Sequence, residues 1–213
     1  MKTRYRGLFI TFEGIDGCGK TTQARLLYNY LKRHDFPVLF LREPGGSPVS
    51  ERIRRVLLDR SLNITPLAEL FLYEAARAHL AETVILPELR KGTIIVCDRY
   101  FDSTTAYQGF GRRLDRRLIG MLNSLASLKR PPDLTFIFDV DYRTSLMRRK
   151  KNADRLEKES RVFFDRVRTG FRSLASQRRV VLLDGRKEIE PLAEQVKEHA
   201  LRLIRRRIHR AAD

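Results

Sequence analysis

The amino-acid sequence predicts an α/β protein with a five-stranded parallel sheet that is covered by helices on both faces. Short runs of β-branched and aromatic residues alternate with longer segments whose apolar residues recur every three or four positions. Such alternation is typical of βαβ units, in which each helix returns the chain to the same edge of the sheet. Because no linker, repeat or low-complexity segment interrupts the pattern, we expect one domain over residues 1–213.

The individual elements follow from this periodicity. The predicted strands occupy residues 8–12, 36–41, 93–97, 134–140 and 179–183. The predicted helices occupy residues 23–32, 49–58, 65–90, 102–109, 114–128, 142–150, 156–176 and 189–208. Thr65 and Pro66 have the N-cap and first-position chemistry of a helix start. Gly109-Phe110-Gly111 is expected to separate two helices, and residues 151–154 are expected to form an exposed loop.

The composition limits the classes of protein to consider. Lys and Arg (43) exceed Asp and Glu (26), which gives a formal net charge of +17. This charge indicates an anionic substrate, a nucleic-acid partner or a basic solvated surface. It is spread over several clusters, so a nucleic-acid partner is not favoured. No apolar run approaches the ~20 residues of a membrane span, and the basic N-terminus precedes a strand rather than a signal-peptide core. The two cysteines, Cys18 and Cys97, predict a reducing, cytoplasmic environment without disulfides.

The most specific motif lies between the first strand and the first helix. Residues 14–21 have the form G-x-x-x-x-G-K-[ST], a phosphate loop whose backbone N–H groups and helix N-terminus bind phosphate oxygens. Lys20 is expected to reach the β- and γ-phosphates of ATP, and the Thr21 hydroxyl to hold Mg²⁺. The predicted nucleotide-binding residues are Gly14, Ile15, Asp16, Gly17, Cys18, Gly19, Lys20, Thr21 and Thr22.

Charged residues follow several other strands at the edge where ligands of parallel sheets bind. Asp98 follows the third strand, where a carboxylate supports Mg²⁺ in phosphate-loop enzymes; the alternative is a helix N-cap. Arg99 and Arg54 are candidates for holding a second anion, or else surface arginines. Glu43 and Asp16 are expected to orient these arginines or to contact sugar hydroxyls. The basic segment 148–157 is a predicted lid over the phosphates, with a solvated helix end as the alternative.

The sequence resembles the bacterial thymidylate kinase family, whose members phosphorylate dTMP to dTDP with ATP. The resemblance covers Phe9 to about Asp184 and is carried by several stretches. These are Phe12-Glu13-Gly14 with the phosphate loop, Arg42-Glu43-Pro44-Gly45-Gly46, Tyr73-Glu74-Ala75-Ala76-Arg77-Ala78-His79, Asp98-Arg99-Tyr100-Phe101-Asp102-Ser103-Thr104-Thr105-Ala106-Tyr107-Gln108-Gly109 and Asp154-Arg155-Leu156-Glu157. It implies a P-loop NTPase fold of the nucleoside monophosphate kinase type, ATP and Mg²⁺ as cofactors, and a homodimer.

The resemblance also implies roles for individual residues. Tyr73 takes the place of a phenylalanine that usually stacks on thymine, Arg77 would bind a base carbonyl, and Thr104 would meet the N3 edge. Arg54 and Arg99 would hold the acceptor phosphate. The implied substrate-binding set is Asp16, Glu43, Pro44, Arg54, Tyr73, Arg77, Arg99, Ser103, Thr104, Tyr107 and Gln108. Asp16 would lie near the sugar 3′-hydroxyl and the metal, Tyr107 under the deoxyribose, and the loop at Asp184 against adenine.

One position bears on the source of the catalytic cation. Where one branch of the family has an arginine in the phosphate loop, this chain has Gly17. The cations expected to act in catalysis are therefore Lys20, Arg99, Arg149, Lys150, Lys151 and Arg155. The alternative functions are another nucleoside monophosphate or deoxynucleoside kinase, and a nucleotide-switched nucleic-acid-binding protein. The Arg-rich C-terminal helix has no counterpart in the family resemblance.

Overall fold

A computed structural model describes residues 7–149 and 155–212, and the five predicted strands are present in it. They are β1 (Leu8–Glu13), β2 (Val38–Arg42), β3 (Ile94–Asp98), β4 (Leu134–Asp139) and β5 (Val180–Asp184). All neighbours pair in parallel, in the order β2-β3-β1-β4-β5. The register pairs Phe12 with Asp98 and with Phe136, so the carboxyl ends of the central strands meet at one edge. The predicted parallel sheet is confirmed.

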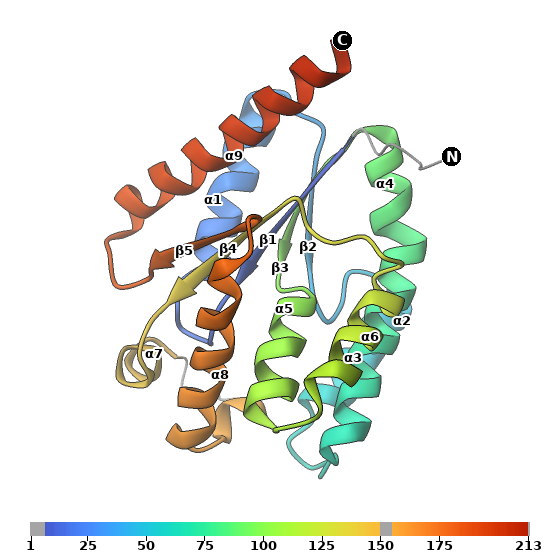
Figure 1. The fold of residues 1–213 in the computed structure, drawn as a ribbon, viewed down its shortest axis with the longest axis vertical. Helices are drawn as coiled ribbons and strands as arrows, with labels where there is room; N and C mark the ends of the chain where they lie inside the picture. The colour runs from blue at the N-terminus through green and yellow to red at the C-terminus, as the bar shows by residue number, and fades with distance from the viewer. Residues whose placement is uncertain (1–6, 150–154, 213) are drawn as a thin grey trace.

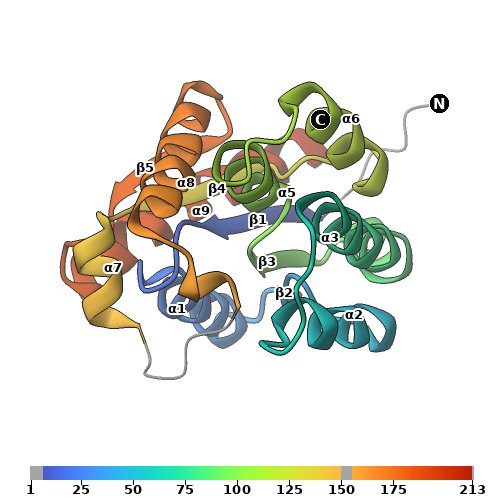
Figure 2. The same ribbon diagram turned by 90° about the horizontal axis from the view of Figure 1, so that it is seen from below.

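Helices cover both faces of the sheet, as predicted. They are α1 (Lys20–Arg33), α2 (Pro48–Leu58), α3 (Pro66–Leu80), α4 (Leu86–Lys91), α5 (Phe101–Thr104), α6 (Arg116–Ala126), α7 (Tyr142–Arg148), α8 (Arg161–Ser173) and α9 (Ile189–Ala212). Figures 1 and 2 show α5 and α8 on one face of the sheet and α1 on the other, where α1 packs against α9. None of the helices in the described ranges combines the length and the apolar character that crossing a membrane requires.

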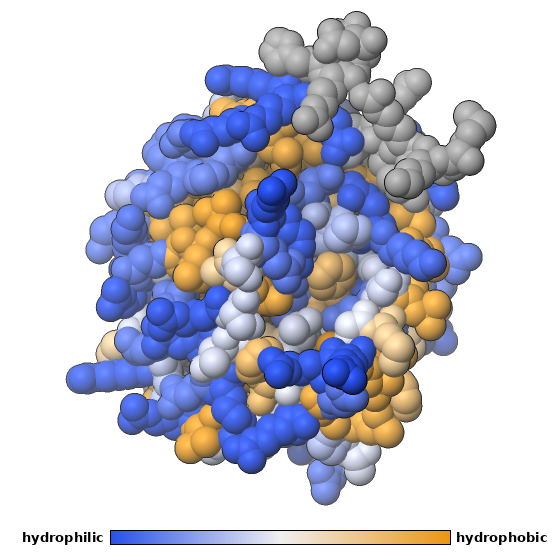
Figure 3. Space-filling view, viewed as in Figure 1, coloured by the Kyte–Doolittle hydropathy of each residue, from blue (hydrophilic) through white to orange (hydrophobic). Residues whose placement is uncertain are grey.

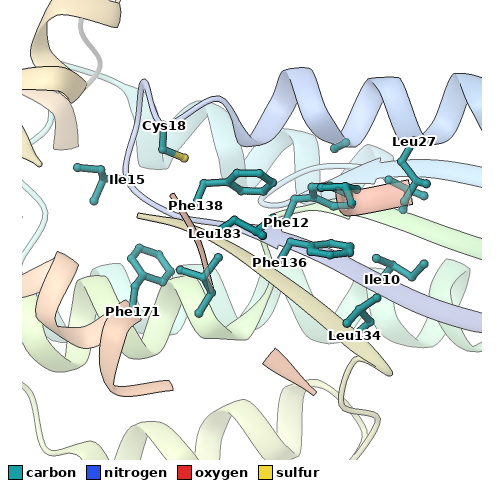
Figure 4. Close-up of a cluster of buried hydrophobic side chains, with 14 of the residues drawn as sticks. Ile10, Phe12, Ile15, Cys18, Leu27, Leu134, Phe136, Phe138, Phe171 and Leu183 are labelled. Carbon is teal, nitrogen blue, oxygen red and sulfur yellow. The ribbon is translucent and has the colours of Figure 1, made fainter. Parts of the chain in front are cut away.

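The core forms where the central strands meet α1 and α8. Phe12, Phe136 and Phe138 from β1 and β4 are fully buried, and the Phe12 ring centroid lies 5.2 Å from that of Phe136. Leu27 of α1 and Phe171 of α8 pack into the same cluster (Figure 4). Each such side chain stabilises the fold by about 1.5–3 kcal/mol when it is removed from water. This rigid centre fixes the positions of the loops at the carboxyl edge.

Two predicted boundaries are wrong. Gly109-Phe110-Gly111 does not separate two helices, because the chain continues as a π-helical segment, η2 (Thr105–Gly111), and the break falls at 112–115. The glycines allow close packing instead: a Cβ on Gly111 would lie 2.7 Å from Cε2 of Phe163. The predicted helix over 65–90 is also not continuous, since a π-helical segment, η1 (Ala81–Ile85), joins α3 to α4.

Other predicted helices differ in smaller ways. The segment 156–176 is divided into two short 3₁₀ turns, η3 (Leu156–Lys158) and η4 (Leu174–Ser176), with α8 between them. Ser160 caps α8, because its hydroxyl accepts the Phe163 N–H. The predicted loop 151–154, and Lys150 before it, lie outside the described residues.

Candidate active site

The phosphate loop has the backbone geometry that its glycines predict. Gly14, Gly17 and Gly19 have φ angles of 137°, 78° and 92°, a region that favours glycine. A Cβ on Gly14 would lie 2.7 Å from the carbonyl oxygen of Phe138, so β4 also excludes a side chain there. Lys20 begins α1 at the end of this loop, and its ammonium lies 3.3 Å from Asp16. The loop therefore presents backbone N–H groups and a cation at the N-terminus of a helix.

A cleft of about 660 Å³ lies over this loop. The residues that line it are Asp16, Gly17, Cys18, Gly19, Lys20, Thr21, Thr22, Gln23, Arg148, Arg149, Gly185, Arg186, Lys187, Glu188, Ile189 and Leu192. The predicted residues Gly14, Ile15 and Asp184 are not among them. Asp184 instead accepts hydrogen bonds from the backbone and the guanidinium of Arg186, and so shapes the loop that forms the far wall. We call this space the donor cleft.

Thr21 and Asp98 meet beside the donor cleft. The Thr21 hydroxyl donates to Oδ2 of Asp98 at 2.5 Å, while Oδ1 of Asp98 is buried without a hydrogen-bond partner. A buried carboxylate oxygen without a partner is costly unless a water or cation satisfies it. The pair therefore fits the predicted Mg²⁺ position. Within the described residues no cluster of three or more His, Cys, Asp or Glu could hold a metal by itself. Such a site suits Mg²⁺, which keeps several water ligands and binds substrate phosphates.

A second pocket brings together every residue of the predicted substrate set. It is lined by Asp16, Glu43, Pro44, Arg54, Leu58, Tyr73, Arg77, Arg99, Tyr100, Ser103, Thr104, Tyr107, Gln108 and Leu156. These side chains come from the phosphate loop, from the loop after β2, from α2 and α3, from the segment that follows β3, and from η3. The sequence analysis gave no pocket role to Leu58, Tyr100 or Leu156, because an apolar or aromatic residue gives no signal that separates a pocket wall from a core. We call this space the acceptor pocket.

Asp16 lines both the donor cleft and the acceptor pocket. One of its oxygens binds Arg99 at 2.5 Å and Lys20 at 3.3 Å, and the other accepts the Tyr107 hydroxyl at 3.2 Å. Burial alone would raise the pKa of Asp16, but the positive charges of Arg99 and Lys20 outweigh it and hold the pKa well below its usual range. The Asp16 carboxylate therefore binds Lys20 of the donor cleft and Arg99 of the acceptor pocket at the same time.

Arg99 follows Asp98 in a left-handed conformation (φ 73°), which turns its side chain back over the phosphate loop. Its guanidinium donates to the Gly14 carbonyl at 2.9 Å and to the Ser103 hydroxyl at 3.0 Å. The Ser103 hydroxyl in turn donates to Glu13 at 2.6 Å. The arginine is thus held between the two sites by side chains of β1 and α5.

Arg77 is fully buried at the base of the acceptor pocket. Its Nε donates to Glu43 at 2.9 Å, its Nη1 to Glu74 at 2.9 Å and to Asn123 at 3.2 Å, and its Nη2 to Thr104 at 2.9 Å. These bonds use four of the five N–H donors of a guanidinium. One N–H on Nη2 remains for a ligand. Burial raises the pKa of Glu43 to about 7, although Arg77 opposes the shift.

The predicted lid cations occupy different places. Arg149 lines the donor cleft and donates to the Ser145 hydroxyl at 2.7 and 3.0 Å, while the Ser145 hydroxyl donates to the Asp16 carbonyl at 2.6 Å. Arg155 instead binds Glu69 at 2.6 Å and the Leu57 carbonyl at 3.0 Å, beside the acceptor pocket. Lys150 and Lys151 lie outside the described residues.

The sequence analysis missed Ser145, and it included Arg148 in the predicted lid segment without giving it a separate role. Arg148 lines the donor cleft and donates to the Gly185 carbonyl at 2.7 Å, which joins α7 to the loop after β5. Nothing in the sequence separates this arginine from its neighbours in the basic run. A serine within a helix likewise gives no sign that its hydroxyl contacts the phosphate loop.

The fold and these two sites define a phosphate-loop kinase with a polyphosphate cleft and an adjoining pocket for a second anionic substrate. Comparison with known proteins identifies the family. The family model described as thymidylate kinase matches residues 12–196, and the chain belongs to the thymidylate kinase family.

Individual relatives resemble the chain over most of its length. A thymidylate kinase from Caldanaerobacter subterraneus subsp. tengcongensis is 44% identical over 187 residues, which cover 86% of this chain and 90% of the relative. One from Geobacter sulfurreducens is 44% identical over 212 residues, covering 94% of this chain and all of the relative. The crystal structure of thymidylate kinase from Ehrlichia chaffeensis superposes with a TM-score of 0.77 at 36% identity, over 92% of this chain and 98% of that one.

Proposed function

We propose that this protein transfers the γ-phosphoryl group of ATP to dTMP and forms dTDP and ADP. The observation that carries the proposal is the junction at Asp16, where the donor cleft and the acceptor pocket meet. Lys20 stands on one side of this junction and Arg99 on the other. An acceptor phosphate held near Arg99 would face a γ-phosphate held near Lys20, which is the alignment that in-line transfer requires.

Catalysis in this arrangement consists of positioning and charge stabilisation. The acceptor oxygen belongs to a phosphate that is ionised at neutral pH, so no side chain has to remove a proton before the new P–O bond forms. Breaking the bond between the γ-phosphorus and the bridging oxygen leaves ADP with the released negative charge. Lys20, Arg99 and Arg149 surround this region, and opposite unit charges ~4 Å apart attract by about 4 kcal/mol at an effective dielectric of ~20.

Thr21 and Asp98 would hold Mg²⁺, and the unpartnered Oδ1 of Asp98 supports this assignment. When bound, the ion supplies positive charge to the β- and γ-phosphate oxygens. The Thr21 hydroxyl would leave Asp98 to bind it, while Asp98 would stay as the carboxylate that orients its water ligands.

The acceptor pocket has hydrogen-bonding groups that suit a thymine base. The remaining N–H of Arg77 would donate to a base carbonyl, with Thr104 and Gln108 beside it. Tyr73 lines the same pocket and would stack on the base, while Tyr107 would lie under the deoxyribose. Arg54, which also donates to the Pro44 carbonyl at 2.9 Å, would hold the acceptor phosphate with Arg99.

A substrate panel tests this function. Coupled assays with dTMP, dUMP, UMP, CMP and AMP should give the highest kcat/KM for dTMP. Lys20→Ala should lower kcat by roughly 10³-fold or more, because Lys20 serves the transferred phosphoryl group, while dTMP binding measured by calorimetry changes little. The exposed Lys91→Ala, remote from both sites, serves as the control. A Lys20→Ala variant with near wild-type turnover would remove the phosphate loop as the donor site.

We also propose that the protein forms a homodimer through α2, α3 and α6. Phe71 of α3 is 50% exposed, and Met121 and Leu125 of α6 are 64% and 70% exposed. The two helices pack on each other, and Figure 3 shows apolar side chains gathered over this part of the surface. Clustered exposed apolar residues are typical of protein interfaces.

Leu125→Glu should convert the dimer to a monomer, because it places an unpaired charge in that interface. Light scattering coupled to size-exclusion chromatography measures the mass. Leu182→Glu is the matched control, since Leu182 is an exposed leucine on β5. A wild-type protein that elutes as a monomer at all concentrations would contradict the proposal.

A further inference from the structure

Glu69 lies outside both sites, yet its carboxylate contacts three side chains around the acceptor pocket. It is fully buried in α3. Its Oε1 accepts Nε2 of Gln108 at 2.8 Å, and its Oε2 accepts the guanidinium of Arg155 at 2.6 Å. Arg112 donates to both oxygens, at 3.2 and 3.1 Å. As the ion-pair partner of two guanidiniums, the Glu69 carboxylate accepts hydrogen bonds and donates none.

This chemistry fixes the orientation of the Gln108 amide. Because the Glu69 carboxylate cannot donate, Gln108 must turn its NH₂ group toward Glu69, whichever way the amide is drawn. The Gln108 carbonyl oxygen then lies on the other side of the amide, and Gln108 lines the acceptor pocket. Within residues 7–149 and 155–212 no protein group donates a hydrogen bond to that oxygen. The oxygen is also not fully enclosed by protein, so a ligand in the pocket can reach it.

Glu69 also fixes one wall of the same pocket. Arg155 is held between Glu69 and the Leu57 carbonyl, and the next residue, Leu156, is buried and lines the acceptor pocket. Glu69 thus acts on the pocket in two ways: it binds Gln108 directly, and through Arg155 it holds the segment that carries Leu156.

We propose that Glu69 is a positioning residue that sets the base selectivity of the acceptor pocket by holding the Gln108 carbonyl toward the ligand. The pocket then presents an acceptor from Gln108 together with the N–H donor of Arg77. This pattern suits a base with an N–H at N3 beside a carbonyl at C4, as in thymine. Cytosine presents the reverse, an acceptor beside an amino group. The inference rests on the proposed phosphorylation of dTMP.

Glu69→Gln tests the inference, because an amide can donate as well as accept and so allows Gln108 to rotate. We expect the ratio of kcat/KM for dTMP to that for dCMP to fall by roughly tenfold or more. Such a change corresponds to the loss of about one hydrogen bond. The KM for ATP should stay within about twofold, since Glu69 does not line the donor cleft. A merely structural defect would lower activity toward both monophosphates and leave their ratio unchanged.

Glu159→Gln is the matched control. Glu159 binds the same Arg112, at 2.5 Å, but does not contact Gln108, so its loss removes an ion pair and leaves the selectivity ratio unchanged. Circular dichroism melts establish that each variant is folded at the assay temperature. If Glu69→Gln is not, Gln108→Leu must show the same fall in selectivity, because it removes the amide and keeps the ion pairs of Glu69.

The outcomes separate the two proposals. A wild-type protein that does not phosphorylate dTMP would overturn the proposed function itself. In an active wild-type background, a folded Glu69→Gln variant that keeps the wild-type ratio would overturn only the role of Glu69. Where Glu69→Gln does not fold, a Gln108→Leu variant that keeps the ratio would do the same.

Discussion

Two buried carboxyl groups, Glu13 and Glu43, have pKa values above the usual range of glutamate. Glu13 ends β1 and accepts the Tyr100 N–H at 2.7 Å and the Ser103 hydroxyl at 2.6 Å. Burial, together with the negative charge of Asp102, raises the pKa of Glu13 to about 8. Burial likewise raises the pKa of Glu43 to about 7. Both groups therefore hold protons in the folded protein at pH values where the unfolded chain has released them.

The free energy of unfolding should consequently fall as the pH rises from about 5 to about 8. The sign follows because the native state binds more protons than the unfolded state above pH ~4.5, so this stability is complete below that pH and is lost through pH 7–8. Glu13→Gln and Glu43→Gln should each flatten the slope, by up to about 1.4 kcal/mol per pH unit for each proton.

Urea denaturation across this pH range measures the slope. The exposed Glu190→Gln on α9 serves as the control and should leave the slope unchanged. Stability that rises between pH 5 and pH 8 in the wild type would contradict the raised pKa values.

Among the elements, α7 connects the phosphate loop to the basic segment after β4. Asp141 begins it as an N-cap, accepting the Thr144 N–H at 2.8 Å. The Ser145 hydroxyl donates to the Asp16 carbonyl and accepts from Arg149. A Cβ on Gly17 would lie 2.5 Å from the Ser145 carbonyl oxygen, so the packed α7 leaves no room for a side chain there. The geometry therefore excludes a side-chain cation at position 17, while Arg149 of the same segment lines the donor cleft.

Ser145→Ala should lower kcat by about tenfold or more, because Arg149 loses the hydroxyl that holds it over the donor cleft. The KM for dTMP should change little, since Ser145 does not line the acceptor pocket. Ser173→Ala also removes a helical serine hydroxyl bonded to a carbonyl, that of Gly170, but it lies in α8 away from the donor cleft. Both variants should lose about 1 kcal/mol of stability or less.

Steady-state kinetics and denaturant unfolding of the two serine variants decide the point. Equal stability losses with equal kcat values would show that α7 contributes only to folding. That result would also remove Arg149 as the cation for transfer.

The sequence predicted those elements and residues whose signals are local. The phosphate loop is recognisable because its glycines and Lys20 are adjacent in the chain, and the strands because each is a short apolar run. Gly111 was read as a helix break because the sequence does not reveal that Phe163 packs against it. Glu69 was missed for a related reason: its partners Gln108, Arg112 and Arg155 are 39 to 86 residues away.

At the scale of the whole molecule, the basic residues behind the net charge of +17 do not contribute equally to the electrostatic field around the protein. Many cations are paired locally, as Arg168 is with Asp139 at 2.6 Å and Arg202 with Glu198 at 2.6 Å. The donor cleft gathers Lys20, Arg148, Arg149, Arg186 and Lys187 around one space, where they outnumber the acidic residues of its lining, Asp16 and Glu188. The C-terminal end of α9, with its arginines, lies at the top of the molecule, away from α7 at its lower left (Figure 1). The positive field that an approaching nucleotide meets is therefore concentrated over the donor cleft.

This distribution predicts how salt affects the reaction. Raising the ionic strength from about 20 mM to about 300 mM should lower kcat/KM for ATP several-fold, because the Debye length shrinks from roughly 20 Å to about 6 Å and steering is screened. The kcat should change less than twofold, since cations that contact the bound phosphates are screened little. The control is a variant that combines Arg202→Ala, Arg205→Ala and Arg206→Ala at the far end of α9. It should leave kcat/KM unchanged at the higher salt and lower it only slightly at the lower salt.

Stopped-flow binding of a fluorescent ATP analogue separates association from dissociation. A kcat/KM that is independent of salt would show that the basic surface does not guide the nucleotide. An effect of the α9 variant as large as that of salt would place the relevant field away from the donor cleft.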